Sequence, residues 1–287
     1  YWNTGAFGGA GIGSFSNPAH GIPGANIIVQ TTGLSRGQLQ GGMPSGFSTG
    51  VWAVLPGLSY PFHKAIFPNG PLIVAGYSAI DNGPQPYRSQ SLVVNVDGYS
   101  TWASSGWDGY YYTLINKPSA GQHQVIINTL GEYGGVRYDQ AWTGQITGFD
   151  IWGGYVRART SDTTLSAMAD TISAALTNAG AIKNSIDDYR SLEITTTASN
   201  FLLDRSLNVN GLVIGSAGLV TSPTAYGLSA NLFSISSGGF HRVAGGSGTG
   251  IDPYLITDVY GLQGMGSSLA FLSAHYSIIN NIDARST

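Results

Sequence analysis

The sequence predicts a mainly β protein that combines β-solenoid-like rungs, an inserted antiparallel β-sandwich and one short amphipathic helix. Short runs rich in Val, Ile, Tyr and Thr recur between Gly, Pro, Asn and Asp turns. The 287 residues include 42 Gly, and only 9% are charged, so uncharged polar side chains have to cover most of the surface. One segment alone shows a clear helical spacing of apolar residues.

Residues 1–87 form a Gly-rich segment in which we expect solenoid-like strands at 25–32, 50–55 and 72–75. Its glycine cluster at 5–13 follows no predicted strand and opens no predicted helix, and a phosphate-binding loop needs both. Asn69-Gly70 lies between prolines and predicts a tight turn. His63 and Lys64 are adjacent but have no nearby carboxylate to orient them, which favours a structural role.

Residues 88–160 contain the most strand-like sequence, with runs at 91–96, 110–115, 124–128, 135–138, 145–152 and 155–159. A spacing of roughly ten residues between strands predicts an antiparallel sandwich or further solenoid rungs. We place a small Ig-like sandwich at 88–141, followed by strands to residue 160. The string from Trp107 to Leu114, with its Asp108-Gly109 turn, resembles a hairpin of carboxypeptidase-regulatory-like and other prealbumin-like sandwiches.

Residues 161–180 predict the amphipathic helix. Ser161 or Asp162 can cap its start, and Asn178 and Gly180 end it. The apolar residues that fall at i, i+3, i+4 and i+7 form one stripe, made of Leu165, Met168, Ala169, Ile172, Ala175 and Leu176. Such a helix suits the face of a sheet or the edge of a solenoid.

Residues 181–287 predict a second solenoid-like segment, with strands at 192–197, 201–203, 207–214 and 232–236 whose polar members can stack as Asn and Thr ladders. Near the end, a strand from Tyr254 to Val259 precedes Gly261 and Gly264, which break the run. A short turn with helical spacing and a strand at 276–279 follow. The apolar residues of that turn are Leu262, Met265, Leu269 and Leu272.

Three stretches carry a family resemblance: SYPFHKAIFPNGP near 58–71, FLLDRSLNVNG near 200–211, and DPYLITDVYGLQGM with YSIINNIDA within 250–285. They resemble segments of filamentous haemagglutinin-like exoproteins, the giant repeat adhesins of two-partner secretion systems. In that family the NNIDA element precedes Ser or Thr and then a Trp-Asn-Gly-rich segment. The resemblance therefore implies one unit of a tandem repeat on the bacterial cell surface, with a repeat junction at Tyr1, Trp2, Asn3, Asn281, Ile282, Asp283 and Thr287.

Charge and composition exclude several partners. A net charge of −3 provides no basic footprint for nucleic acid or for lipid headgroups. No apolar stretch approaches the roughly 20 residues of a spanning helix, so we expect no membrane insertion. The absence of Cys excludes disulfides, thiolate zinc sites and thiol catalysis.

The residues with catalytic potential are scattered, so we predict no metal site, no cofactor and no enzymatic activity. No two histidines are four residues apart; they are His20, His63, His123, His241 and His275. The adjacent Asp187-Asp188 lies in a polar stretch and suits a solvated turn. Polysaccharide-cleaving β-helix enzymes gather acids and basic residues on one sheet face, whereas Lys64, Lys117 and Lys183 are far apart here.

One aromatic cluster is a candidate interaction surface, consisting of Trp102, Trp107, Tyr110, Tyr111 and Tyr112. Because alternate residues of a strand face opposite sides, Tyr110 and Tyr112 share one face and Tyr111 takes the other. One face should be core. The other is open to three interpretations: subunit packing, a self-assembly surface, or a platform for a sugar ring.

Together with these patterns, the resemblance implies a structural or adhesive extracellular protein, a repeat unit or subunit of a bacterial fibre or filament assembled by β-strand stacking. Its expected partners are neighbouring copies of itself and, as a further option, cell-surface glycans. The alternative is a carbohydrate-active β-helix enzyme or a glycan-binding module. An isopeptide bond from Lys117 to an Asn or Asp, assisted by Glu132, is a third option for covalent stabilisation.

Overall fold

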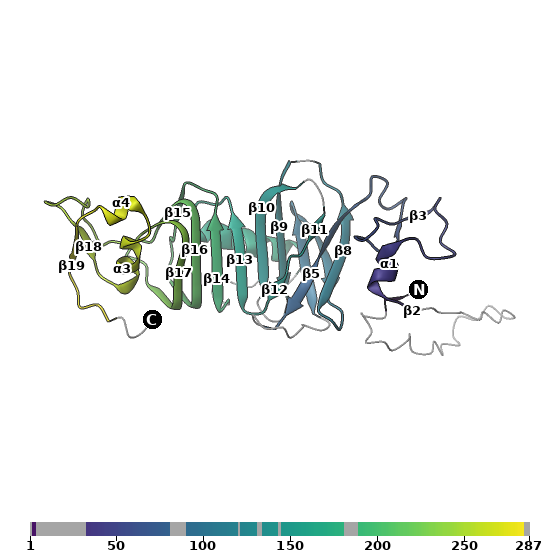
Figure 1. Ribbon diagram of the computed structural model, residues 1–287, viewed down its shortest axis with the longest axis horizontal. Coiled ribbons are helices and arrows are strands. Elements are labelled where there is room, and N and C mark those ends of the chain that lie inside the picture. Colours follow the sequence, from purple (N-terminus) through teal and green to yellow (C-terminus); the bar gives the residue numbers. More distant parts are fainter. Residues whose placement is uncertain are drawn as a thin grey trace.

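The computed structural model describes residues 2–3, 33–80, 90–119, 121–130, 134–142, 145–180 and 189–283. Strands hold 46% of these residues and helices 14%, which confirms the mainly β class. Figure 1 shows an elongated molecule, with α1 and β3 at one end and α3, α4, β18 and β19 at the other. The glycine cluster at 5–13 and the strand expected at 25–32 lie outside the described residues.

The amino-terminal end holds short elements. Strand β1 (Trp2–Asn3) pairs in parallel with β2 (Gly33–Leu34), and β3 (Trp52–Ala53) pairs antiparallel with β4 (Phe62–His63). Helix α1 (Arg36–Gly41) begins with a capping box, in which the Gln38 N–H donates to Ser35 Oγ at 3.3 Å and the Ser35 N–H donates to Gln38 Oε1 at 2.8 Å.

A long sheet runs along the molecule. Its order is β7 (Tyr99–Ser104), β6 (Ser91–Val96), β9 (Gly121–Thr129), β10 (Gly135–Trp142), β13 (Tyr155–Thr160), β14 (Ser191–Thr196), β16 (Leu207–Thr221) and β17 (Leu228–His241), with β15 (Asn200–Leu202) also on β16. Pairing is antiparallel from β7 to β10 and parallel from β10 onward. The pairing mode therefore switches at β10.

A second sheet faces the first part of the long sheet. Its central strand β5 (Pro71–Ala79) pairs antiparallel with β8 (Tyr110–Asn116) and in parallel with β11 (Ile146–Thr147) and β12 (Ile151–Trp152). A shared hydrophobic cluster includes Val74 and Ile146 from this sheet and Val94 and Ile127 from the long one. We call residues 71–152 the paired-sheet region. Its pairing crosses the boundary expected between residues 87 and 88.

Residues 155–241 form what we call the parallel region, where neighbouring strands repeat the same side-chain positions. Leu192 pairs with Leu212, which pairs with Phe233, so equivalent positions lie 20 and then 21 residues apart. Ile194 and Ile214 repeat the pattern on the same face. These residues belong to a second hydrophobic cluster, separate from that of the paired-sheet region.

The same hydroxyl corner recurs on three neighbouring strands of the parallel region, β13, β14 and β16, ending the first two and interrupting the register of the third. Thr160, Thr196 and Ser216 occupy paired positions, and each is buried. Each side-chain oxygen accepts the backbone N–H two residues later, at 2.9, 3.0 and 2.9 Å. Outside the corner, Asn231 Nδ2 donates to Asn210 Oδ1 at 3.0 Å, which provides one rung of the expected Asn ladder.

Helix α2 (Leu165–Asn178) confirms the predicted stripe, because all six of its expected apolar residues are buried and five of them, all but Ala175, belong to the hydrophobic cluster of the long sheet. The predicted cap was wrong. Thr164 accepts the Ala167 N–H at 3.0 Å, whereas Ser161 and Asp162 bind other side chains described below.

The carboxy-terminal end contains β18 (Tyr254–Ile256), α3 (Val259–Met265), α4 (Leu269–Leu272) and β19 (Tyr276–Ile278), with β18 and β19 parallel. The expected break at the glycines was wrong, because α3 runs through both. A Cβ on Gly261 would lie 2.7 Å from the Arg242 carbonyl oxygen, and one on Gly264 would lie 2.6 Å from that of Phe240. The glycines therefore form the buried side of α3.

The helical spacing expected there is confirmed by α3 and α4, and the two leucines of α4 are exposed. Leu269 is 85% exposed and Leu272 is 63% exposed. On the buried side, the Tyr260 hydroxyl accepts the Ala230 N–H at 2.7 Å and lies 3.1 Å from the Ala230 carbonyl oxygen. Helix α3 thus lies on the outer strand, β17.

Candidate functional site

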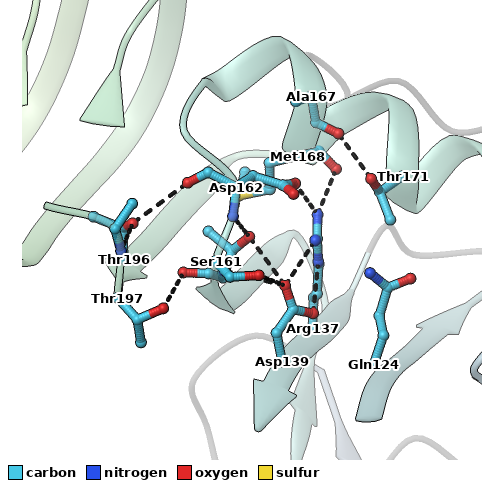
Figure 2. Close-up of polar contacts among 12 residues, drawn as sticks. Gln124, Arg137, Asp139, Ser161, Asp162, Ala167, Met168, Thr171, Thr196 and Thr197 are labelled. Carbon is cyan, nitrogen blue, oxygen red and sulfur yellow. Dashed lines mark hydrogen bonds and ion pairs between the residues drawn. The ribbon is translucent and has the colours of Figure 1, made fainter. Parts of the chain in front are cut away.

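A buried arginine organises the border between the two regions. Arg137 lies on β10, paired with Ile126 and Ala158, so its side chain points to the α2 face of the long sheet. It is 1% exposed. Figure 2 shows its guanidinium bridging two carboxylates and the helix: Nη1 donates to Asp162 Oδ2 at 2.6 Å and to the Met168 carbonyl at 3.2 Å, and Nη2 donates to Asp139 Oδ2 at 2.9 Å.

Asp139 is fully occupied as an acceptor. Besides Arg137, its Oδ2 accepts the Ser161 N–H at 3.1 Å, the Ser161 hydroxyl at 3.2 Å and the Thr160 hydroxyl at 3.3 Å (Figure 2). Burial alone would raise its pKa, but the hydrogen bonds and charge of Arg137, with the Ser161 bonds, hold the pKa below its ordinary value. A general acid needs the opposite shift, so Asp139 is suited to holding structure.

A polar pocket of about 610 Å³ adjoins this network. It lies where β6, β13 and β14 end and β9 begins, beside Asp139 of β10, at the point where antiparallel pairing gives way to parallel pairing. Every residue that lines it is polar or charged: Asp97, Gln122, His123, Gln124, Asp139, Arg159, Ser161 and Thr197.

One wall of the pocket is fixed by the turn between β6 and β7. Asp97 has φ 51°, the only positive value among the non-glycine residues that the structure describes. Its Oδ1 accepts the Gln124 N–H at 2.9 Å, and its Oδ2 lies 2.5 Å from His123 Nδ1. His123 Nε2 lies 2.6 Å from the Ser119 carbonyl oxygen, so both ring nitrogens are held.

Three side chains at the pocket are uncommitted. The side chains of Gln122, Gln124 and Arg159 make no hydrogen bond or ion pair with the part of the chain that the structure describes. Figure 2 shows Gln124 beside Asp139 and Arg137 with no contact drawn to either. With respect to the residues that the structure describes, the pocket therefore has a hydrogen-bonded base and a rim of two amides and one guanidinium without partners.

The aromatic cluster expected from sequence does not form one surface. Tyr111 is fully buried, and its hydroxyl donates to the Phe149 carbonyl at 2.5 Å, so it takes no part in an exposed surface. Tyr112 packs on Tyr60, with ring centroids 4.6 Å apart. Trp102 and Trp107 are 48% and 49% exposed. The side chains of Tyr110 and Tyr112 point to the face opposite Tyr111, as expected. That face is not free, because it contacts residues of the amino-terminal end.

Tyr110 belongs to an arginine stack that sequence analysis missed. The Arg36 guanidinium lies 3.7 Å from the Tyr110 ring centroid, Nη1 donates to the Tyr77 hydroxyl at 2.8 Å, and Nη2 pairs with Asp108. Arg36 is 41 residues from Tyr77 in sequence, so no local pattern indicates the contact.

The expected repeat-junction residues lie at both ends of the molecule. Trp2 and Asn3 form β1, while Asn281, Ile282 and Asp283 follow β19 at the opposite end (Figure 1). Tyr1 and Thr287 lie outside the described residues, as do His20, Asp187, Asp188, Lys183 and Glu132. Lys117 is exposed.

The remaining histidines are held in aromatic contacts or at the surface. His63 packs edge-on against Trp52, and His241 stacks on Phe271, where burial lowers its pKa. Within the described ranges, no three His, Cys, Asp or Glu side chains gather closely enough to hold a metal ion. None of the described helices has the length and apolar character needed to span a bilayer.

No protein-family model matches this chain, and a search of curated proteins finds no similar sequence.

Proposed function

We propose that this chain is a structural and adhesive unit of an extracellular bacterial fibre. In this proposal, the parallel region is a β-solenoid whose coils are the repeated strands, and the paired-sheet region is a sandwich inserted before it. The observation that carries the proposal is the repetition in the parallel region: the same apolar positions recur at intervals of 20 and 21 residues from β14 to β16 and β17, and the same hydroxyl corner recurs on β13, β14 and β16.

This construction suits a rod that has to resist tension. Successive strands of a solenoid are joined by backbone hydrogen bonds that run along its axis, so the rod resists extension without many ion pairs. The low charge of the chain agrees with such a design, since ladders of Thr, Ser and Asn replace surface salt bridges. The described ends of the chain lie at opposite ends of the long axis, which favours assembly end to end (Figure 1).

The shape of linked copies tests the proposal. We would compare the single chain with a chain of two copies joined directly, using small-angle scattering and negative-stain electron microscopy. A fibre unit predicts that the maximum dimension roughly doubles while the cross-section stays constant. Two particles packed side by side, or two beads with a variable angle, would contradict it.

The size of the natural polypeptide and its location complete the test. Under denaturing conditions, covalent repeats would give a mass many times 29.9 kDa, whereas non-covalent subunits would give 29.9 kDa. Protease treatment of intact source cells should release fragments of the chain if it lies on the cell surface. Retention of the whole chain after such treatment would count against the extracellular assignment.

A further inference from the structure

We propose that this chain cuts itself at the peptide bond between Asp252 and Pro253, through attack by the Asp252 carboxylate. The bond lies in the connection between β17 and β18, and it is the only Asp-Pro bond in the 287 residues. Each chain reacts once, so the reaction is self-cleavage and not enzymatic turnover. It needs no contact between copies, and it can therefore fail while the fibre proposal holds, or hold while that proposal fails.

The loop before the bond is folded around the carbonyl oxygen that the reaction would charge. The Asp252 carbonyl oxygen accepts the Ser247 N–H at 3.0 Å and the Thr249 N–H at 3.1 Å. The Ser247 hydroxyl is a third donor, at 3.4 Å. Attack on the carbonyl carbon makes this oxygen negative, and hydrogen bonds to a charged acceptor are stronger than those to a neutral one. Fixed donors of this kind are the components of an oxyanion hole.

Two glycines let the loop come this close. Gly246 and Gly248 have φ of 86° and 77°, values that residues with a side chain rarely adopt. A Cβ on Gly246 would collide with the Pro253 carbonyl oxygen, and one on Gly248 would lie 2.5 Å from the Tyr254 ring. The donors are therefore held against the bond by backbone that only glycine can form.

The Asp252 side chain is available as the nucleophile. Asp252 is exposed, and its carboxylate makes no hydrogen bond or ion pair with the residues that the structure describes. Attack of its Oδ on the carbon of its own backbone carbonyl closes a five-membered ring, and such an intramolecular reaction gains from proximity. Carboxylates are known to form covalent intermediates in this role.

The chemistry balances with solvent water and a solvent proton. As the new C–O bond forms, the C–N bond to Pro253 breaks, and its electron pair goes to the Pro253 nitrogen, which takes up the proton. A cyclic anhydride remains at Asp252. Water opens it to give two carboxyl groups at Asp252 and a free amino terminus at Pro253. Because proline has no backbone N–H, its nitrogen cannot attack the side chain and form a succinimide instead.

The cut would leave the carboxy-terminal end in place while the chain stays folded. The fragment that begins at Pro253 is held on β17 by side chains of α3 and its cap. Arg242 Nε donates to Asp258 Oδ2 at 2.7 Å, and the Ala230 N–H donates to the Tyr260 hydroxyl at 2.7 Å. The native particle should therefore keep its size, and only denaturing conditions should separate the two fragments.

Intact-mass spectrometry tests the proposal. The folded chain is incubated at pH 5 with protease inhibitors, beside the same chain unfolded in urea, which has the same Asp-Pro bond without the loop around it. We expect fragments 1–252 and 253–287, whose masses add up to the intact mass plus one water. They should form at least about tenfold faster in the folded chain. Absence of these fragments, or equal rates in the two samples, would overturn the proposal.

Variants separate the nucleophile from the loop. Asp252→Ala removes the carboxylate at an exposed position and should abolish the cut. Gly246→Ala forces a side chain against the Pro253 carbonyl and should lower the rate about tenfold. The matched control is Gly57→Ala, which has open space around it, φ of 75° and a place between β3 and β4, at the other end of the molecule (Figure 1). It should leave the rate unchanged.

Circular dichroism at pH 5 checks the folding of each variant. Continued cutting at this bond in Asp252→Ala would overturn the role of the carboxylate. Equal losses of rate in Gly246→Ala and Gly57→Ala would overturn the role of the loop. Because single chains are used throughout, the outcome is independent of whether copies assemble into a fibre.

Discussion

In the paired-sheet region, short connections join β6 to β7 and β9 to β10, whereas β5 pairs with β8, β11 and β12, which are distant in sequence. In the parallel region, the partners on β14, β16 and β17 lie mostly 20 or 21 residues apart, and those on β13 and β14, between which α2 is inserted, lie 36 apart. The first region packs two sheets on each other around Val94 and Ile127, and the second packs its strands on α2 and on one another. The two regions therefore differ in what sets register: hairpin turns and sequence-distant pairs around one core in the first, and repeated strand positions in the second.

Arg137 joins the regions, and its loss should give the largest effect. Arg137→Leu leaves Asp139 and Asp162 without their cation in a mostly buried setting, which typically costs about 3–5 kcal/mol. Urea unfolding followed by circular dichroism measures the free energy of unfolding. The exposed Arg159→Gln should stay within about 0.5 kcal/mol of the natural chain. Similar losses for the two variants would show that the buried network is not what joins the regions.

A pair of cavity variants tests whether the regions open separately. Leu212→Ala and Ile127→Ala each remove a fully buried side chain, and each should cost about 2–5 kcal/mol. Hydrogen exchange read by mass spectrometry should show faster exchange in β14 to β17 for the first variant and in β5 to β9 for the second. If either variant accelerates exchange evenly along the whole chain, the two regions form one cooperative unit.

The hydroxyl corner is specific to the parallel region and should have a smaller effect. Thr196→Ala leaves the Ala198 N–H without its acceptor and should cost about 1–2 kcal/mol. Thr196→Ser restores the oxygen and should recover most of that loss. Equal stabilities of the Ala and Ser variants, measured by thermal unfolding, would remove the corner from the features that stabilise the region.

The pH dependence of stability should give the smallest effect. Because the pKa of Asp139 is lower in the folded chain than in the unfolded one, its contribution is complete above the unfolded value, about 3.9, and is lost as the pH falls through the folded value. Asp139→Asn should therefore flatten the decline of the free energy of unfolding below about pH 4. An unchanged slope between pH 4 and pH 2 would contradict this assignment.

Local periodicity predicted the helix well because every residue of its stripe is within 11 positions of the others, and all six are buried. The strand runs were also legible from alternation and turn residues. The prediction of a break at the glycines of α3 was wrong. Gly usually weakens a helix, but here two glycines allow close contact between α3 and β17. Only the tertiary contact reveals that advantage.

The pocket was beyond sequence analysis because its residues come from five separate places in the chain, brought together by the switch in strand pairing. A partial signal existed. Arg137 and Asp139 are two residues apart on one strand, so they share a face, and that face also carries Ile126 of the neighbouring strand. The sequence did not show that α2 covers this face of the sheet, and the burial of Arg137 depends on that tertiary contact.

The seating of α3 on β17 has a consequence for how copies avoid unwanted stacking. An outer strand normally offers a row of free amides and carbonyls to any passing chain, and this is how amyloid-like aggregates begin. Here the Ala230 backbone is taken by the Tyr260 hydroxyl, and the Phe240 N–H donates to Ser267 Oγ at 2.8 Å. An incoming strand would find the backbone already engaged at these two positions, so the seating of α3 opposes extension of the sheet beyond β17.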